Sequence, residues 1–514
     1  MSELGFWRLA AADPDACAVV EPDGSRVSRG RLLAQANAMA RLLREQGLER
    51  GDRVVGVAAN EAANLALVLA CQQSGAYYVP INTALTTTEV AHILADAEPV
   101  VVIASVAYTE MLAAAAEEVG FPVERRFALG EAEGFRDLLT ESAGCPSGPL
   151  ENRTPGSYLG YTSGTTGRPK GVYRPLAEGD PDDVFAAGAQ WQLGMFDITP
   201  LNEGKHLVTS PLSHTAVSGL AVTSLHFGHA VVLMERFDAE LVLRLIDQER
   251  ITTTHMVPTQ LHRLLRLPAE VRSRYDVGSM RNLVHGAGPC PEETKREIID
   301  WFGEVVWEYY GATEAAGTVI SAPEWLQRPG SVGRPQPGAE VMILGSDGQE
   351  LPTGESGRVY LRMGTRAFEY RGDPDKTRAS RVGDFVTVGD LGRLDEEGYL
   401  YLLGRSSEVV VSGGINVYPA EVEAAILSHH EVEDVGVIGV PDPEWGERVV
   451  AVVQVRPDSA LATDERSAQA VLQEYLADRL ARYKVPRTVT VVERLPRAAN
   501  GKLRKQLLVP MAQR

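Results

Sequence analysis

Residues 161–172 read YTSGTTGRPKGV, a stretch crowded with glycine, threonine and serine around a single lysine, Lys170. Stretches of this composition usually form flexible surface loops. They can also wrap a phosphate group, which they contact through backbone N–H groups, hydroxyls and an ammonium. Composition alone leaves both interpretations open, so the rest of the chain has to decide between them.

The general phosphate-binding motif nearest to this stretch is the P-loop, G-x-x-x-x-G-K-[ST]. Counted from Gly164, its second glycine falls on Pro169, which has no N–H to donate, and Gly171 stands where the motif has Ser or Thr. The G-x-S-x-G elbow of serine hydrolases also fails, because Ser163 is followed directly by Gly164. A kinase, an ordinary ATPase and a serine hydrolase are therefore disfavoured.

The composition is that of a soluble globular protein with several domains. The chain has 514 residues, 44% of them hydrophobic and 23% charged, and a prior of roughly 150 residues per domain predicts two to four domains. The net charge of −19 argues against nonspecific binding to nucleic acid or to anionic membranes. A local basic pocket for an anionic cofactor is compatible with this charge.

We expect a cytoplasmic protein without a transmembrane segment. No run approaches the roughly 18 apolar residues that span a bilayer. The start, MSELGFWRLAAADPDA, lacks the basic region and apolar core of a secretory signal. The four cysteines lie far apart, without the spacing of metal ligands or of a disulfide framework, and are expected to be reduced: Cys17, Cys71, Cys145 and Cys290.

From residue 54 apolar strands alternate with amphipathic helices, which favours parallel βαβ units. The first set has strands at 54–59, 77–82 and 100–104 and helices at 60–75 and 86–97, and Gly75 ends the first helix. A second set of apolar stretches runs from about residue 205 to residue 310. After about residue 333, short strands and turns replace the helical periodicity, with a hairpin turning at residues 395–398.

These patterns predict an α/β fold. A large N-terminal domain, residues 1–404, has doubly wound α/β subdomains and a small β-rich subdomain. A small α+β C-terminal domain, residues 405–514, reads as strand, helix, strand, strand, helix, strand. The boundary rests on the change in sequence texture, because no Pro- or Ser-rich linker marks it.

Several further stretches that could carry binding or catalytic residues follow residues 161–172 along the chain. They are SPLSHTAVSG (210–219), HGAGPC (285–290), YYGATE (309–314), FVTVGDLG (385–392), YLYLLGRSSEVVVSGGINVYPAEVE (399–423) and LPRAANGKLRK (495–505). Taken singly, they could be a core histidine, packed tyrosines, an aspartate cap and a lysine in a solvated turn. Taken together, they resemble the adenylate-forming enzymes, which include acyl- and aryl-CoA synthetases, luciferases and peptide-synthetase adenylation domains.

The resemblance implies that the chain activates a carboxylate with ATP, releases pyrophosphate and transfers the acyl group from AMP to a thiol. It implies ATP, Mg²⁺ and coenzyme A as cofactors and co-substrates. The stretch 161–172 would grip the β- and γ-phosphates, with Lys170 assisting at the outgoing pyrophosphate. The implied phosphate ligands are Thr162, Ser163, Gly164, Thr165, Thr166, Gly167 and Lys170.

The same resemblance assigns the adenine slot to HGAGPC and YYGATE. Tyr310 would stack on adenine, since an aromatic ring suits a π face. Backbone would approach the base closely at Gly286, Ala287 and Gly288, and Gly311 is a further implied binding residue. Thr313 would reach the phosphate, and Glu314 would hold magnesium, a hard cation that prefers carboxylate oxygen.

The C-terminal motifs supply the ribose, thiol and catalytic groups implied by the resemblance. Asp390 would accept hydrogen bonds from the ribose hydroxyls, and Arg405 has donors suited to ribose or phosphate oxygens. Gly413 and Gly414 resemble the strand along which the pantetheine arm of coenzyme A slides. Lys502 would neutralise charge that develops on the carboxylate and the α-phosphate during adenylation.

His214 would border the carboxylate pocket, together with Thr215, Ala287, Tyr309 and Gly311. The residues that follow His214 are small, which suits a medium, branched or ring-bearing acid better than acetate. No charged side chain in these stretches awaits a substrate amine, which disfavours amino acids.

In adenylate-forming enzymes the C-terminal domain rotates between one pose for each half-reaction. The chain departs from the family at the pivot, where Ser407 stands in place of the usual Asp or Lys and Glu408 follows. A short polar residue can still absorb a backbone rotation, so we expect the rotation to survive.

Two alternatives to a CoA ligase stay open. One is an acyl-AMP ligase that loads a separate carrier protein, although no carrier domain follows Lys502. The other is a nucleotide-binding regulator without catalysis, which is disfavoured because Lys502, Glu314, His214 and Asp390 are all present. The expected partners are a small carboxylic acid and coenzyme A, and the chain could assemble as a homodimer.

Overall fold

The computed structural model describes residues 3–163, 169–200, 204–363, 368–456, 459–462, 465–497 and 501–512. The chain forms two compact units, each built from several segments. Unit 1 comprises Met1–Met256, Leu267–Val284 and Thr365–Ser380, and unit 2 comprises Val257–Arg266, His285–Gly364 and Arg381–Arg514.

The first sheet of unit 1 is parallel and confirms the βαβ pattern predicted from residue 54. Its strand order is β7-β6-β5-β3-β4-β8. The bounds are β3 (Arg53–Val57), β4 (Tyr77–Pro80), β5 (Val101–Ser105), β6 (Arg126–Leu129), β7 (Arg136–Asp137) and β8 (Ser157–Tyr158). Apolar cores lie on both faces, because successive side chains of a strand point to opposite sides.

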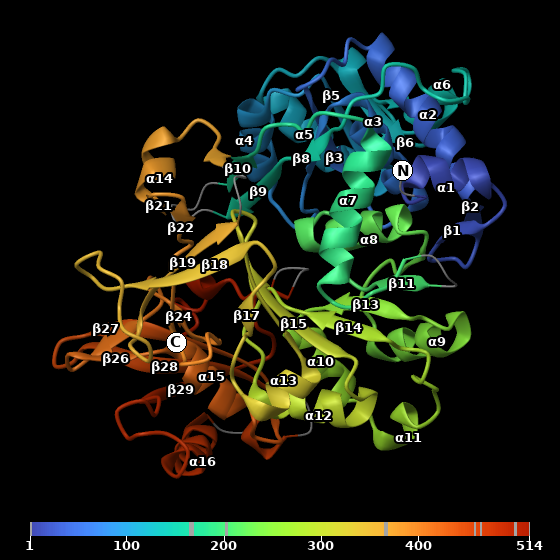
Figure 1. The fold of residues 1–514 in the computed structure, drawn as a ribbon. Coiled ribbons are helices and arrows are strands. Elements are labelled where there is room, and N and C mark those ends of the chain that lie inside the picture. The colour runs from blue at the N-terminus through green and yellow to red at the C-terminus, as the bar shows by residue number, and fades with distance from the viewer. Residues whose placement is uncertain are drawn as a thin grey trace. The chain divides into compact units, whose positions relative to one another are not determined.

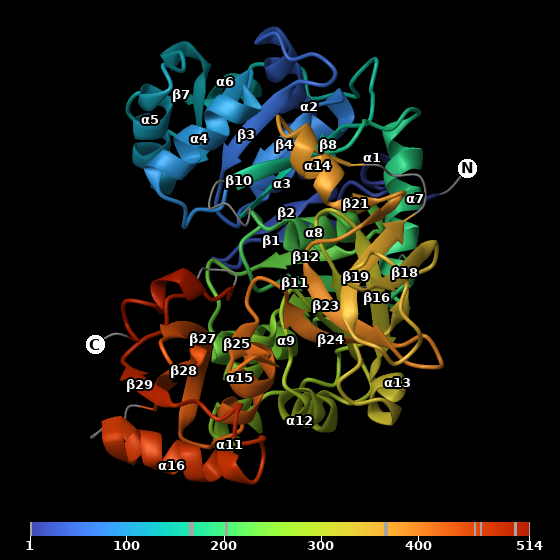
Figure 2. The same ribbon diagram turned by 90° about the vertical axis from the view of Figure 1, so that its left-hand side faces the viewer.

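Helices cover both faces of this sheet, as a doubly wound fold requires. α2 (Arg29–Glu45) and α3 (Ala62–Ser74) contribute to one core. α4 (Thr87–Ala97) and α5 (Thr109–Glu118) contribute to the other and lie side by side (Figure 2). Gly75 ends α3 as predicted: its φ of 71° is left-handed, and a Cβ there would lie 2.6 Å from Thr154 Cγ2.

Unit 1 also contains a second run of strands, ordered β13-β11-β12-β1-β2. The bounds are β1 (Cys17–Val20), β2 (Arg26–Ser28), β11 (Lys205–Val208), β12 (Ala230–Leu233) and β13 (Thr253–Met256). α8 (Thr215–His226) connects β11 to β12 and packs beside α7 (Pro181–Gly194), as Figure 1 shows. A three-stranded antiparallel sheet joins β9 (Gly160–Ser163), β10 (Pro169–Tyr173) and β20 (Glu369–Tyr370).

In unit 2 the pairing becomes mainly antiparallel, as the change of texture predicted. The second segment of this unit begins at His285, the last residue of β14 (Asn282–His285), and β15 (Val306–Gly311) then pairs with β16 (Ala316–Ser321). Two hairpins follow, β18 (Ala339–Leu344) with β19 (Gly357–Met363) and β23 (Asp390–Leu394) with β24 (Leu400–Arg405). The second hairpin turns over residues 395–399, which confirms the predicted turn.

The last part of unit 2 carries its own sheet and core. β25 (Val410–Ser412) and β26 (Ile415–Val417) form a hairpin where the sequence predicted a single strand. The helices and strands that follow keep the predicted order: α15 (Pro419–Leu427), β27 (Val432–Asp442), β28 (Gly446–Val455), α16 (Glu465–Ala477) and β29 (Thr488–Val492). β29 pairs parallel with β28, and α15 and α16 close the core.

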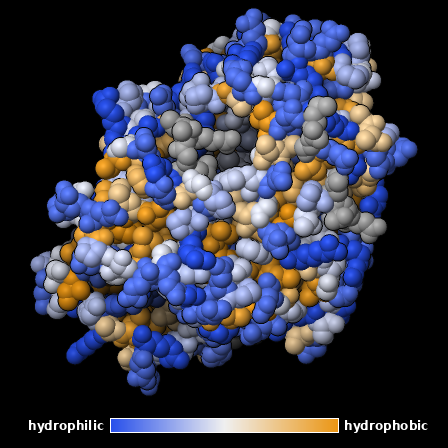
Figure 3. All heavy atoms as spheres, in the orientation of Figure 1, coloured by the Kyte–Doolittle hydropathy of each residue, from blue (hydrophilic) through white to orange (hydrophobic). Residues whose placement is uncertain are grey.

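The surface is largely polar, in agreement with the many charged residues of the chain. Polar and charged residues cover much of the face in Figure 3, with apolar residues interspersed among them. Within the described residues, no helix combines the length and the apolar character needed to cross a membrane. The four cysteines are free thiols, as expected from their spacing.

Candidate active site

The stretch 161–172 connects the two strands of the β9–β10 hairpin. Thr162 pairs with Lys170, and Tyr161 pairs with Gly171. Six predicted positions of this stretch lie wholly or in part outside the described residues. Gly164, Thr165, Thr166 and Gly167 fall outside the described residues, as do the side chains of Thr162 and Ser163, so their phosphate contacts stay predictions.

Lys170 is anchored in unit 1 by an acidic residue that the sequence analysis missed. Its ammonium forms an ion pair with Asp373, a residue 203 positions further along the chain. The hydrogen bond from Lys170 is the main cause that lowers the pKa of Asp373. Asp373 also caps α14 (Pro374–Ala379) by accepting a hydrogen bond from Lys376 N at 2.9 Å. An Asp directly before a proline-led helix is a recognisable cap signal, but it says nothing of Lys170.

Tyr161 fixes the hairpin from the other strand. Its hydroxyl donates to Asp96 of α4, and burial followed by this hydrogen bond raises the pKa of Tyr161. A Cβ at position 171 would lie 3.1 Å from the Tyr161 ring, which is tighter than an ordinary contact. Close packing against Tyr161 therefore favours glycine at one of the two positions that depart from the P-loop motif.

His214 stands at the N-terminal end of α8, and Thr215 is the first residue of that helix. Burial lowers the pKa of His214 to about 4, so the imidazole is neutral near pH 7. Among the described residues, His214 Nε2 has no hydrogen-bond partner although it is buried. A buried polar atom without a partner is rare in folded proteins and is suited to meeting a ligand atom.

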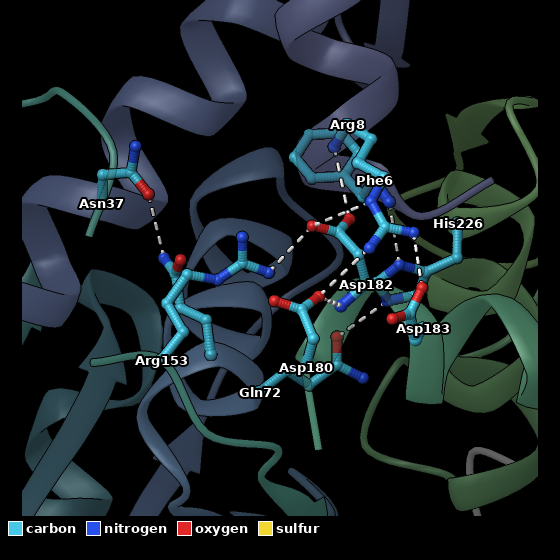
Figure 4. Close-up of polar contacts among 10 residues, drawn as sticks. Phe6, Arg8, Asn37, Gln72, Arg153, Asp180, Asp182, Asp183 and His226 are labelled. Atoms are coloured by element: carbon cyan, nitrogen blue, oxygen red, sulfur yellow. Dashed lines mark hydrogen bonds and ion pairs between the residues drawn. The ribbon is translucent and has the colours of Figure 1, made fainter. Parts of the chain in front are cut away.

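The opposite end of α8 is fixed by His226 (Figure 4). His226 Nδ1 accepts a hydrogen bond from Phe6 N at 3.1 Å, and Nε2 pairs with Gln72 Oε1 at 3.0 Å. The Phe185 ring of α7 stacks on the imidazole with centroids 5.0 Å apart. Three different helices thus hold α8, which positions His214 and Thr215 at its other end.

A buried aspartate of α7, Asp182, connects this helix to α1 (Phe6–Ala12) and to Arg153 (Figure 4). Asp182, with 4% of its side chain exposed, accepts hydrogen bonds from Arg153 Nη2 at 3.0 Å and from Arg8 N at 3.2 Å. The Arg153 guanidinium also lies 4.6 Å from the centroid of the Trp7 ring. A buried carboxylate needs such pairing, because an unpaired charge in a core is strongly destabilising.

Unit 1 should lose stability in mild acid because it buries several neutral histidines. Burial lowers the pKa from 6.5 to about 3 for His206 and His226 and to about 4 for His214 and His255. Between these values and 6.5 the unfolded chain binds more protons than the folded chain, so stability falls as pH decreases from 6.5. Urea midpoints measured from about pH 7 to about pH 4.5 should decline.

A matched pair of variants separates this effect from the titration of carboxylates. His226→Gln removes one buried imidazole and should flatten the decline, whereas His430→Gln changes an exposed one and should not. Equal slopes for the two variants would contradict the assignment of the decline to buried histidines.

In unit 2 the predicted adenine slot is built by close backbone approach. A Cβ at position 286 would lie 2.7 Å from both the ring and the carbonyl oxygen of Tyr309, so only glycine fits there. Ala287 has a φ of 63°, an uncommon left-handed conformation for a residue with a side chain. Such backbone strain is often found at binding sites, which agrees with the predicted role of this loop.

Tyr310 and Arg405 converge on Asp390 (all in unit 2). The Tyr310 hydroxyl donates to Asp390 Oδ2 at 2.7 Å, and Arg405 Nε lies 3.3 Å from Asp390 Oδ1. Asp390 and Arg405 are register partners at the ends of β23 and β24. Burial and the Asp390 carboxylate raise the pKa of Tyr310. Three residues predicted to bind adenine, ribose or phosphate therefore form one contiguous group, and β15 is irregular between Tyr310 and Gly311.

Lys502 lies within electrostatic range of this group. Partial desolvation and then the positive charge of Arg405 lower the pKa of Lys502, while Glu408, Asp390 and Glu314 act to raise it. The structure thus brings the Lys502 ammonium, on a residue exposed to solvent, within electrostatic range of two predicted nucleotide ligands and the predicted magnesium ligand, from positions spread over nearly 200 residues of sequence. This grouping is the strongest feature of the candidate site.

Thr313 and Glu314 lie in the connection between β15 and β16, and Glu314 is buried with 8% exposure. The described residues contain no group of three or more His, Cys, Asp or Glu side chains able to hold a metal ion. Magnesium does not need such a group, since it keeps several waters and is often bound by one or two carboxylates plus substrate phosphates. A buried carboxylate at position 314 fits that mode of binding.

Gly413 and Gly414 form the tip of the β25–β26 hairpin, and both have positive φ. A Cβ at position 413 would lie 2.8 Å from Trp445 Cε3, and Gly413 N donates to Trp445 O at 2.8 Å. The tip is thus held against Trp445, a residue that the sequence analysis did not single out. The predicted contact of this hairpin with pantetheine stays a prediction.

Known protein families match both the N-terminal and the C-terminal part of this sequence. The family described as AMP-binding enzyme matches residues 6–369, and the AMP-binding enzyme C-terminal domain matches residues 421–502. Feruloyl-CoA synthase of Amycolatopsis sp is 34% identical over 98% of this chain and 97% of its own. Long-chain-fatty-acid–CoA ligase FadD13 of Mycobacterium tuberculosis is 32% identical over 99% of this chain and 98% of its own.

A solved structure agrees with these relatives. o-Succinylbenzoate CoA synthetase of Bacillus subtilis, in complex with its acyl-adenylate intermediate, superimposes with a TM-score of 0.80 and 29% identity, covering 98% of each chain. The motifs, the fold and the sequence matches all point to one assignment. The chain belongs to the family of AMP-binding enzymes.

Proposed function

We propose that the chain, an ATP-dependent carboxylate–CoA ligase that works through an acyl-adenylate, activates a medium, branched or ring-bearing carboxylic acid. The observation that carries the chemistry is the electrostatic grouping of Lys502 with Glu314, Asp390 and Arg405. The substrate class rests on small residues after the neutral His214, and relatives with bulky acyl substrates support it. AMP and pyrophosphate are the expected products beside the thioester.

The adenylation step depends mainly on electrostatics, because a carboxylate has to approach a polyanion. Lys502 would neutralise charge on the reacting carboxylate and α-phosphate, and the stretch 161–172 would hold the β- and γ-phosphates. Asp390 would orient the ribose, since its carboxylate has acceptor sites beyond those used by Tyr310 and Arg405. His214, neutral and with a free Nε2, would contact the acid without repelling or protonating it.

Magnesium is the proposed metal, held by Glu314 with the phosphates of ATP. When bound, it would supply positive charge that offsets the charge of the phosphates. Glu314 would fix its position relative to the α-phosphate, and Thr313 would orient the same phosphate. The acceptor thiol is proposed to be coenzyme A, guided by the Gly413–Gly414 hairpin tip.

Glu314→Gln should raise the Mg²⁺ concentration needed for half-maximal pyrophosphate release by at least about tenfold, because an amide is a weaker ligand than a carboxylate. Calorimetric titration with ATP, with and without Mg²⁺, gives a second readout. In Glu314→Gln, Mg²⁺ should change the affinity for ATP much less than it does in the wild-type protein. Glu304→Gln, an exposed carboxylate before β15, is the matched control. An unchanged magnesium requirement in Glu314→Gln would remove the assignment.

The proposed function is tested by pyrophosphate release with a panel of acids, each with ATP and Mg²⁺. The panel contains acetate, octanoate, a branched acid, benzoate, a cinnamate and an indole acid. We expect release with octanoate, the branched acid or a ring-bearing acid and little with acetate. Release with acetate alone would refute the substrate class, and no release with any acid, despite ATP binding, would support a regulator.

The acceptor is tested with the acid that the panel identifies. Coenzyme A and a phosphopantetheinylated acyl carrier protein are compared as thiols, and the thioester is detected by mass spectrometry. Thioester with coenzyme A supports the CoA ligase, whereas thioester with the carrier protein alone would identify a loading enzyme. A cytoplasmic location is proposed because the four free thiols suit a reducing compartment.

A further inference from the structure

We infer that Arg497 and Lys505 are positioning residues that hold the segment carrying Lys502 in place for adenylation. This inference rests on the proposed role of Lys502. The two residues flank Lys502 on either side and belong to unit 2 with it. Among the described residues, neither side chain forms a hydrogen bond or ion pair with a predicted nucleotide ligand. Any effect of the two residues on adenylation would therefore act through Lys502.

On the N-terminal side of Lys502, Arg497 links Asp434 of β27 to Gly501, the residue directly before Lys502. Its Nε and Nη2 lie 2.5 Å and 2.7 Å from the two carboxylate oxygens of Asp434, a bidentate ion pair. Its Nη1 donates to the carbonyl oxygen of Gly501 at 2.6 Å. Both charged side chains are largely buried, with 19% and 15% exposure, and such planar pairing fixes direction as well as distance.

On the C-terminal side, Lys505 lies between two carboxylates. Its Nζ is 2.9 Å from Glu408 Oε2 and 2.9 Å from Glu423 Oε1. Burial acts to lower the pKa of Lys505, but Glu423 and Glu408 outweigh it and the pKa is raised. Glu423 is itself held, since it accepts a hydrogen bond from Val437 N of β27 at 2.8 Å.

Close packing also surrounds Gly501 and Leu503, the residues on either side of Lys502. Gly501 has a φ of 79°, and a Cβ there would lie 2.5 Å from Thr259 Oγ1. Leu503 packs so closely on β27 that a Cβ at position 436 would lie 2.5 Å from Leu503 Cδ2. Residue 503 also bridges to Arg497 in antiparallel fashion.

The need for such anchoring follows from the surroundings of Lys502. Lys502 is exposed to solvent, and the neighbouring Arg405 disfavours its charged ammonium in the observed position. An exposed lysine on a flexible four-carbon stem can turn its ammonium away from a like charge and toward water. The two ion pairs, at Asp434 and at Glu408 with Glu423, stabilise the segment against that movement, which keeps Lys502 near Glu314 and Asp390.

The test separates the two half-reactions in Arg497→Met and Lys505→Met. We expect pyrophosphate release to slow by about 10- to 100-fold in kcat, since small misplacements of reacting groups cost rates of this order. KM for ATP and for the acid should change by less than about twofold, because ground-state binding is untouched. Thioester formation from supplied acyl-AMP should stay at the wild-type rate.

Conservative and control variants distinguish positioning from general destabilisation. Lys505→Arg retains both ion pairs and should recover most of the adenylation rate. Lys484→Met removes a different ion pair of the same part of the chain, in which Lys484 Nζ lies 2.6 Å from Glu421 Oε1, and should leave adenylation unchanged. Urea midpoints of all variants are measured in parallel.

The outcomes also separate this inference from the proposed function. If Lys502→Ala keeps full adenylation, the proposed role of Lys502 fails, and with it the basis of the inference. If Lys502→Ala abolishes adenylation while Arg497→Met and Lys505→Met behave like Lys484→Met, only the inference is overturned. Equal losses in both half-reactions, together with lower urea midpoints, would overturn it as well, because they indicate a purely structural role.

Discussion

Lys502→Ala is expected to slow adenylation by about 10²- to 10³-fold, the usual cost of removing one preorganised group that stabilises charge in a transition state. The ammonium lies within electrostatic range of Glu314 and Asp390, so its charge acts on the groups predicted to bind magnesium and ribose. The measurement is ATP–pyrophosphate exchange in the presence of the activated acid. Thioester formation from supplied acyl-AMP should be largely retained, since Lys502 is proposed to leave the site for that step.

The contrast between the two half-reactions is the informative result. Lys484→Ala, at an ion pair of the same part of the chain, should leave both half-reactions intact and controls for loss of surface charge. If Lys502→Ala slowed both steps equally, the proposed rotation of residues 405–514 between two poses would be wrong. If it slowed neither, Lys502 would have no role in adenylation.

Lys295→Met is expected to lower the free energy of unfolding by about 3–5 kcal/mol, the usual cost of leaving a buried charge without its partner. Lys295 Nζ lies 2.5 Å from Glu308 Oε2, and the two side chains are only 1% and 7% exposed. Burial already raises the pKa of Glu308 despite this ion pair. Urea denaturation followed by fluorescence measures the shift, and ATP affinity should fall too, because Glu308 directly precedes Tyr309 and Tyr310 on β15.

A double variant tests whether the unpaired charge causes the loss. Lys295→Met combined with Glu308→Leu replaces the pair by apolar side chains of similar size, which is often neutral or stabilising. The double variant should therefore be more stable than Lys295→Met alone. If the single and double variants were equally destabilised, the loss would come from packing around Trp325, whose ring lies 4.8 Å from Lys295 Nζ.

Local sequence patterns predicted most of the secondary structure, whereas the residues of the candidate site came from the family resemblance, and their roles stay predictions. Alternating apolar stretches predicted β3, β4 and β5 with α3 and α4 between them, because period and end signals act within a few residues. Gly75 ended α3 as predicted, since only a left-handed conformation satisfies that helix end without strain. The β25–β26 hairpin was read as one strand, because the turn at Gly413 and Gly414 is short and apolar residues flank both sides.

The sequence by itself determined the class of fold, the family resemblance and the residue types of the site. Only the tertiary structure decided which side chains pair: Lys170 with Asp373, Tyr310 and Arg405 with Asp390, Lys295 with Glu308, and Arg497 and Lys505 with acidic residues of unit 2. Most of these partners are separated by long stretches of chain. Their pairing depends on how strands and helices pack, and charge and hydropathy along the sequence do not record that packing.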